Sequence, residues 1–330
     1  MNCLRKPLTK LIVVAGVAAG FLPGCRARER DVNPVQPTIT VNRPRVPLGG
    51  ALEVSYAWNV GAAAKPIQPG YQAFVHVLDP RGTVLFADDH VPVPPPDRWS
   101  PGRTYSYRRT VFVPVLPYVG EARLVMGLYS PRGGARVALA AEDIGRRAYR
   151  VGTIELVPQT ESIFLVYKQG WHDPEVDPEN PATERTWTAQ EAVVSFKNPR
   201  KDVVVYLEAE TCLRCFPRSP TLTVSVGPAA TTLPIESREP FLRRFRARVA
   251  DFGDDEWVDL RLRMSESFVP SQLTPPPNAD PRRLGLFVYH LSLARVEDVS
   301  PLDGLDIEDL RPGFGGLVVP GQAAVSPGER

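Results

Sequence analysis

The chain has 330 residues, with 39 basic and 37 acidic side chains and a formal net charge of +2. This balance gives no extended positive field, so nucleic acid is not expected as a partner. Hydrophobic residues make up 43% of the chain, which excludes wholesale disorder, and the length suits two domains. The 36 prolines are too many for a helical bundle.

The first 25 residues have the pattern of a bacterial export signal. Basic residues within 1–10 precede an apolar stretch over 11–22, which is too short to span a bilayer. The segment ends in Leu22-Pro23-Gly24-Cys25, which resembles the bacterial lipoprotein box. The resemblance implies a signal peptide over 1–24 and a lipidated Cys25. An ordinary cleaved signal with an incidental cysteine is the alternative.

Lipidation would determine where the protein lies. Two or more acyl chains on Cys25 would anchor it stably to a membrane, and the charged, proline-containing segment 25–36 would form a tether. The residue after Cys25 is not aspartate, which in the enterobacterial sorting rule favours the outer membrane. The expected location is therefore the bacterial cell envelope, with the membrane as a partner.

From Ile39 onward, apolar and polar residues alternate with a period of two. Such runs predict strands with one buried face, and turn signals between them favour antiparallel pairing. The expected fold class is all-β, with two tandem antiparallel sandwiches that are immunoglobulin-like or jelly-roll-like. We place the first domain at 37–158, the second at 159–296 and a largely disordered tail at 297–330.

The best-defined strands of the second domain are predicted over 203–210, 221–226 and 257–264. In the last of these, Val258 and every second residue after it share an apolar face, and Trp257 lies on the polar face. Trp257 is therefore an expected exposed aromatic.

Short segments resemble non-catalytic β-sandwich modules of bacterial envelope and glycan-associated proteins. In the first domain these segments are 74–79, 88–90, 99–102 and 127–131. In the second domain, 187–192 and 280–285 are similar to segments of β-domains attached to glycosyltransferases. The resemblance implies a binding or accessory role near polysaccharide, without a reaction.

A dense polar cluster, Asp88-Asp89-His90, leads into a proline-rich loop. The two carboxylates are weak candidates for a Ca²⁺ site, but neighbouring strand residues point to opposite faces. The alternative is a polar strand end whose carboxylates accept backbone N–H groups. No metal and no other cofactor is expected.

Aromatic side chains in predicted loops are the candidate sugar-binding groups. Trp99 and Tyr118 could stack on sugar rings with Asp89 and His90 as polar partners. The alternative is that each large aromatic closes the end of a sandwich.

Two cysteines, Cys212 and Cys215, are close in the sequence but lack a redox-fold context or a second pair of zinc ligands. In an exported protein they are expected to form a local disulfide.

No nucleophile elbow, metal-protease pattern or phosphate-binding loop is present in the sequence. We therefore expect a protein that is not an enzyme. The leading hypothesis is an envelope-anchored lipoprotein with a non-catalytic glycan-binding or polysaccharide-associated role. The alternative is a structural or assembly protein of the envelope that acts through protein–protein contacts.

Overall fold

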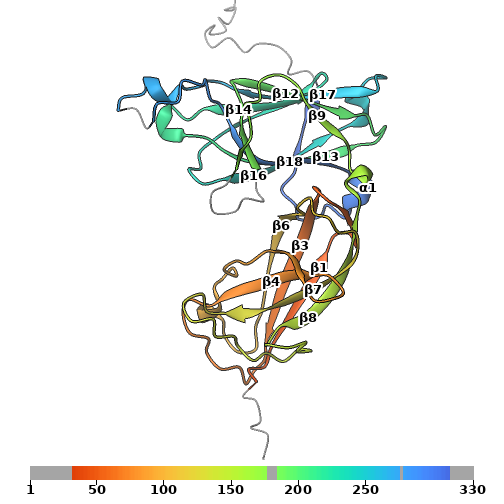
Figure 1. Ribbon diagram of the computed structural model, residues 1–330, viewed down its shortest axis with the longest axis vertical. Coiled ribbons are helices and arrows are strands. Elements are labelled where there is room, and N and C mark those ends of the chain that lie inside the picture. Colours follow the sequence, from red (N-terminus) through yellow and green to blue (C-terminus); the bar gives the residue numbers. More distant parts are fainter. Residues whose placement is uncertain (1–31, 177–183, 276–277, 313–330) are drawn as a thin grey trace, which may run out of the picture. The chain divides into compact units, whose positions relative to one another are not determined.

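The strands between residues 35 and 157 form two sheets. The structure, a computed structural model, describes residues 32–176, 184–275 and 278–312. The strands are β1 Val35–Val41, β2 Arg45–Pro47, β3 Ala51–Val60, β4 Gln72–Leu78, β5 Val84–Ala87, β6 Thr104–Phe112, β7 Gly120–Tyr129 and β8 Tyr149–Val157. One sheet has the order β1-β3-β6 and the other β2-β8-β7-β4-β5. All neighbours are antiparallel except β2 and β8, and Figure 1 shows the two sheets as facing layers.

The core of this first sandwich lies between its two sheets. Along β3, Val54, Tyr56 and Trp58 are at most 4% exposed and pack into one hydrophobic cluster with residues of β4 and β7. This alternation places every second side chain of β3 between the sheets. Ala51 and Glu53 lie on the opposite face of β3 and are buried as well.

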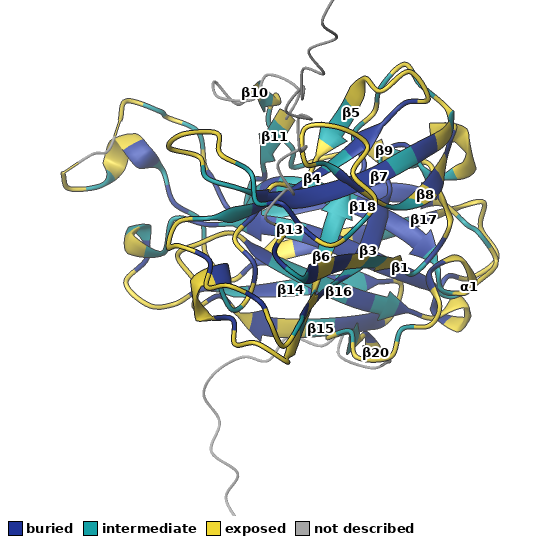
Figure 2. Cartoon of the chain, turned by 90° about the horizontal axis from the view of Figure 1, so that it is seen from below, coloured by how far each residue is buried: buried dark blue, intermediate teal, exposed yellow. Residues whose placement is uncertain are grey.

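The strands after residue 164 form two further sheets. Their bounds are β9 Leu165–Tyr167, β10 Glu175–Val176, β11 Glu184–Trp187, β12 Glu191–Lys197, β13 Val203–Glu210, β14 Thr221–Val226, β15 Ala229–Pro234, β16 Phe241–Ala247, β17 Trp257–Met264, β18 Phe287–Arg295, β19 Glu308–Asp309 and β20 Arg311–Pro312. The sheet orders are β10-β11-β18-β13-β16-β19 and β20-β15-β14-β17-β12-β9. Figure 2 shows that buried residues concentrate in the strands and exposed ones in the loops.

The structure confirms the predicted fold class, an all-β protein with sandwiches. In β17, Val258 and Leu260 are at most 4% exposed, whereas Trp257 is 38% exposed, as the alternation predicts. The predicted domain limits of 37–158 and 159–296 stay a prediction; strand pairing changes between β8 and β9. The described residues from Val32 onward belong to one compact unit.

Helices are short throughout the described residues. The α-helix α1 spans Val296–Val299, and the 3-10 helices are η1 Pro96–Arg98, η2 Gln159–Glu161, η3 Leu213–Cys215, η4 Val249–Asp251 and η5 Pro270–Gln272. Within the part of the chain that the structure describes, no helix has the length and apolar character needed to cross a membrane. The predicted signal peptide and Cys25 lie outside the described residues.

The segment after the last long strand is folded as far as residue 312. β19 pairs in parallel with β16, and β20 pairs with β15, so each sheet gains an edge strand. Between them Leu310 is 1% exposed in the core of the second sandwich. One buried leucine and two short pairings thus hold residues 297–312, while the predicted disorder of the tail stays a prediction. Residues 313–330 lie outside the described residues.

The two sandwiches meet at a buried ion pair. Glu53 is 3% exposed, and its two carboxylate oxygens accept hydrogen bonds from Arg244 at 2.7 and 3.2 Å. Thr110 also donates to Glu53, at 2.9 Å. Beside this pair, the rings of Phe112 and His290 stack in parallel with centroids 4.2 Å apart. The contact thus combines a charge-assisted fork with aromatic packing.

A disulfide closes the loop after β13. The sulfurs of Cys212 and Cys215 are 1.97 Å apart. Both cysteines pack against a small hydrophobic cluster that contains Phe216 and Phe268. This cluster is separate from the main core of the second sandwich. The disulfide therefore packs the loop against a local hydrophobic cluster.

Candidate functional site

Trp99, which the sequence predicts as an exposed ring for sugar binding, is buried in the structure. Trp99 is 8% exposed, and its ring lies 5.1 Å from that of Trp58 and 5.8 Å from that of Tyr105. Its indole N–H donates to the Pro94 carbonyl at 2.9 Å. With both faces occupied by protein, Trp99 cannot stack on a sugar. It closes the sandwich end, which was the alternative reading of this residue.

His90 is also buried, inside a polar network. Its Nε2 lies 2.7 Å from the hydroxyl of Tyr107, and its Nδ1 lies 2.7 Å from the carbonyl of Asp88 and 3.3 Å from the carboxylate. Because both neighbours of Nδ1 are oxygen acceptors, this nitrogen carries the proton. Tyr107 in turn accepts from Trp58, and burial raises the pKa of Tyr107 to about 12. The predicted ligand-binding role of His90 is thus replaced by a structural one.

Asp88 is the charged centre of this network. Its carboxylate accepts a hydrogen bond from Tyr56 at 2.7 Å and a two-pronged contact from Arg109 at 2.8 and 3.0 Å. Burial opposes ionisation of Asp88, but hydrogen bonds from His90 and Arg109 outweigh it, so its pKa lies below the ordinary value. The same partners hold the carboxylate in place on the inner face of the sandwich.

Stability of the protein should therefore depend on Asp88 in acid. A carboxyl group whose pKa is lower in the folded than in the unfolded chain stabilises the fold above its unfolded pKa, about 3.9. That contribution is lost as the pH falls through the folded pKa. Asp88→Asn should cost about 1–3 kcal/mol at pH 7 and flatten the acid limb of the stability curve. Urea unfolding between pH 2 and 7 measures this, and parallel curves for both proteins would refute it.

Asp89 faces away from Asp88, as alternation predicts. It accepts from the Val75 backbone N–H at 3.1 Å and lies 3.5 Å from His76. Burial opposes its ionisation, yet hydrogen bonds from His76 and Val75 outweigh it and lower the pKa of Asp89. Among the described residues, no three His, Cys, Asp or Glu side chains are grouped to hold a metal ion. The two carboxylates therefore do not converge on one cation, and Ca²⁺ binding stays a prediction without a geometric basis.

Tyr118 lies at the other end of the sheet. Tyr118 is half-buried and precedes β7, which begins at Gly120. Its hydroxyl donates to the carbonyl of Glu121 at 2.6 Å. His90 instead bridges to Ala73, the partner of Leu128 near the end of β7. Eight residues of strand separate these points, about 25 Å at roughly 3.3 Å per residue. The structure does not bring Tyr118 together with Asp89, His90 and Trp99.

Trp257 is the predicted site residue that lies in a groove. It is the first residue of β17, and its partner across the strands is Lys197, the last residue of β12. The Lys197 backbone N–H donates to the carbonyl of Phe164, which directly precedes β9, at 3.1 Å. Strands β12 and β17 and the residue before β9 thus place Lys197, Trp257 and Phe164 side by side on the outer face of the sheet.

These side chains form one wall of a surface groove of about 570 Å³. The rings of Phe164 and Trp257 lie 6.1 Å apart at 69°, and they are 63% and 38% exposed. The groove is lined by Gln159, Thr160, Ser162, Ile163, Phe164, Lys197, Asn198, Pro199, Trp257 and Arg295. We call it the Trp257 groove.

The polar groups of the groove differ in what they can offer a ligand. Asn198 is fully engaged: its amide donates to the carbonyls of Gly253 and Asp255, and its oxygen accepts from the Arg200 N–H. It therefore fixes the loop that forms the groove rim. Among the described residues, the ion-pair partner of the Lys197 ammonium group is the exposed Glu256, at 3.8 Å. Its ammonium group is thus the cation most accessible to a bound molecule.

Sequence reasoning missed Phe164 and Lys197. Both are ordinary strand residues in the sequence, and only the pairing of β9 with β12 and of β12 with β17 places them beside Trp257. The one available signal was the position of Trp257 on the polar face of its strand.

Fold and site together define a β-sandwich protein with an open aromatic groove. No family model matches the chain, and no curated protein matches it. Among solved structures it is similar to the secreted serine protease VesC from Vibrio cholerae, with 9% identity and a TM-score of 0.22. The match covers 78% of this chain but 51% of the protease chain, so this chain spans about half of that protein.

Two further matches are to carbohydrate-binding modules. One is a module of the β-sandwich superfamily, with 8% identity, a TM-score of 0.26 and coverage of 81% of this chain and 100% of the module. The other is the CBM22 tandem domain of Xyn10C from Paenibacillus barcinonensis, with 9% identity, a TM-score of 0.22 and coverage of 79% and 93%. At these TM-scores the similarity does not assign a function to this chain.

Proposed function

We propose that this chain is a lipid-anchored protein of the bacterial envelope that binds glycans without catalysis, through the Trp257 groove. The observation that carries the proposal is the exposed ring pair of Phe164 and Trp257 beside Lys197 in a groove of about 570 Å³. A contiguous patch of exposed apolar side chains on a protein surface often marks a binding site. This volume falls in the range of small-ligand sites, about 300–1,000 Å³.

The chemistry of the groove matches a sugar. The C–H face of a pyranose packs on an aromatic ring, and its hydroxyls need donors and acceptors at the rim. Phe164 and Trp257 supply the faces, and Lys197 and Gln159 supply polar groups.

The lining favours binding over hydrolysis. Glycoside hydrolysis uses a pair of carboxyl groups on either side of the scissile bond. The described residues that line the groove include no Asp, Glu or His. The groove thus offers contacts that hold a sugar but not the pair of carboxyl groups that hydrolysis uses.

Trp257→Ala should weaken glycan binding by at least about tenfold, which corresponds to about 1.4 kcal/mol. The loss follows from removing the larger of the two exposed rings. Isothermal titration of the full chain, purified in detergent, against envelope polysaccharides and a panel of oligosaccharides measures it. Tyr118→Ala is the matched control, because this aromatic lies outside the groove, and it should bind as the wild type does.

Two outcomes would contradict the proposal. Equal affinity of wild type and Trp257→Ala would remove the groove from the binding site. Absence of binding across the panel would favour the alternative, an assembly role through protein contacts, for which the exposed edge strand β9 would be the first surface to test.

The anchor is tested separately. Cys25→Ser should release the protein from the membrane fraction, since the acyl chains that hold it there would be absent. Fractionation of cells grown with a labelled fatty acid measures both label and location. A mutant that stays in membranes without the label would show that Cys25 is not the anchor.

A further inference from the structure

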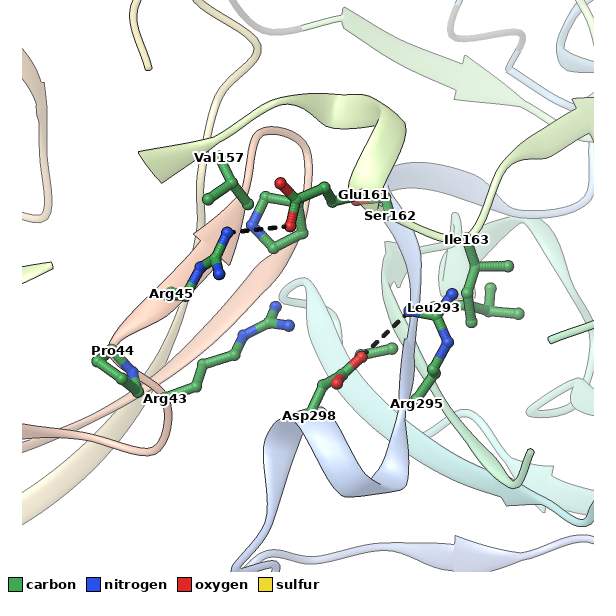
Figure 3. Close-up of a pocket in the computed structure, with 12 residues that line it drawn as sticks. Arg43, Pro44, Arg45, Val157, Glu161, Ser162, Ile163, Leu293, Arg295 and Asp298 are labelled. Carbon is green, nitrogen blue, oxygen red and sulfur yellow. Dashed lines mark hydrogen bonds and ion pairs between the residues drawn. The ribbon is translucent and has the colours of Figure 1, made fainter. Parts of the chain in front are cut away.

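A second cavity, of about 320 Å³, adjoins the Trp257 groove and is rich in arginine. Figure 3 shows Arg43 and Arg45 on one side and Arg295 on the other. The acidic residues of the lining are Glu161 and Asp298. Three cations against two anions leave the lining with one positive charge in excess.

Two of the three arginines are paired with acids. Arg45 lies 3.4 Å from Glu161, and Arg295 lies 3.3 Å from Asp298. Both contacts appear as dashed lines in Figure 3. The excess charge therefore belongs to the third arginine, Arg43.

Arg43 is a buried cation that makes no ion pair within 4 Å among the described residues; Asp298 acts on it only through its charge at longer range. It is 7% exposed, its Nη2 donates to the Ala51 carbonyl, and its Nε is buried without a hydrogen-bond partner. Burial lowers the pKa of Arg43 from its ordinary value. Figure 3 shows its guanidinium extending into the space between Arg45 and Asp298.

An unpaired buried cation is unfavourable, so an anion bound in this cavity would stabilise it. A buried polar group without a partner costs about 1–3 kcal/mol, and a charged group costs more. A guanidinium binds a carboxylate through two parallel N–H···O contacts, a geometry that fits Arg better than Lys. An oxyanion in the cavity would supply the missing counter-charge.

The cavity and the Trp257 groove are neighbours that share three lining residues. Ser162, Ile163 and Arg295 line both of them. One extended molecule can therefore reach both, with a sugar ring on Trp257 and an acidic substituent near Arg43.

We infer that the Arg43 cavity binds the carboxylate of an acidic glycan, such as a uronic acid unit, whose neighbouring sugar lies in the Trp257 groove. The glycan part of this inference rests on the proposed function. The carboxylate part rests on the Arg43 cavity alone. It assigns this protein to acidic rather than neutral polysaccharides.

The test compares a short oligouronate with its carboxyl-reduced, neutral counterpart, titrated against the full chain. The wild type should bind the oligouronate about tenfold or more tightly than the neutral sugar. Arg43→Met, which keeps the side-chain length and removes the charge, should abolish this preference and leave the neutral affinity unchanged. Equal binding of both sugars by the wild type, or a preference that persists in Arg43→Met, would overturn the inference.

A second readout separates this inference from the proposed function. Free glucuronate should raise the thermal unfolding temperature of the wild type and not that of Arg43→Met. If glucuronate stabilises the wild type while no oligosaccharide binds, the cavity stands and the glycan groove fails. If neutral oligosaccharides bind and glucuronate has no effect, the groove stands and the cavity fails.

Where Arg43→Met does not fold, Arg43→Lys is compared with the wild type instead. This variant keeps the positive charge but loses the two parallel N–H groups of the guanidinium, and it should reduce the preference for the oligouronate. Inorganic sulfate is the further probe: stabilisation by sulfate equal to that by glucuronate would show a general anion site and overturn the carboxylate assignment.

Discussion

Replacing Glu53 with glutamine is expected to lower the free energy of unfolding by about 3–5 kcal/mol, because it leaves Arg244 as a buried, uncompensated cation. Glu53 and Arg244 side chains are 3% and 13% exposed, so water cannot take over the lost interaction. Arg244 also donates to Thr110, which fixes its fork in one orientation. Equilibrium unfolding in urea, followed by fluorescence and circular dichroism together, measures the loss.

An exposed ion pair provides the control for this prediction. Arg45 lies 3.3 Å from Glu155, with both side chains more than half exposed, and Arg45→Gln should change stability by less than about 1 kcal/mol. The double variant Glu53→Leu with Arg244→Met should recover most of the stability lost in Glu53→Gln, since it removes both charges. A loss in Glu53→Gln no larger than in Arg45→Gln would show that the buried pair contributes nothing.

Trp99→Ala is expected to lower the free energy of unfolding by about 3–5 kcal/mol, the range for buried aromatic residues replaced by alanine. The substitution removes the ring packed between Trp58 and Tyr105 and leaves a cavity at the end of the first sandwich. It also leaves the Pro94 carbonyl without its indole donor.

The same variant distinguishes the structure from the expectation drawn from the sequence. Had Trp99 been a sugar platform, Trp99→Ala would lose binding with little effect on stability. The buried position predicts the reverse: a lower unfolding midpoint and an unchanged affinity for any glycan bound in the Trp257 groove. Titration at a temperature at which the variant is fully folded measures this, and a folded variant that no longer binds would contradict it.

The sequence was informative where one side of a strand is buried. The predicted strands 203–210, 221–226 and 257–264 coincide with β13, β14 and β17. Their alternation of apolar and polar residues is a direct consequence of the two-residue period of a strand. The same period placed Trp257 outside and separated Asp88 from Asp89.

The sequence was uninformative where burial comes from distant parts of the chain. Trp99 follows a proline-rich loop, and nothing local states that β3 and β6 will bring Trp58 and Tyr105 against it. In the sequence His90 resembles an exposed polar residue. In the fold its two ring nitrogens form hydrogen bonds with Asp88 and Tyr107. Burial of such groups depends on which strands pair, a property that the local pattern does not encode.

The tail shows the same limit. The segments of β19 and β20 contain two residues each, too few for any period, and they are ordered only because β16 and β15 each offer an open edge. Likewise nothing in the sequence around Arg43 indicates a buried charge. Its burial beside the end of β18 is seen only in the folded chain.

The late position of β19 and β20 has a consequence for biosynthesis. The sheet that contains β15 cannot receive its last strand until residue 312 has left the ribosome, whereas Ala229, which pairs with it, emerges much earlier. Pairings between residues so far apart in the chain form slowly and come late in folding. The second sandwich therefore remains open at two edges until the end of its synthesis.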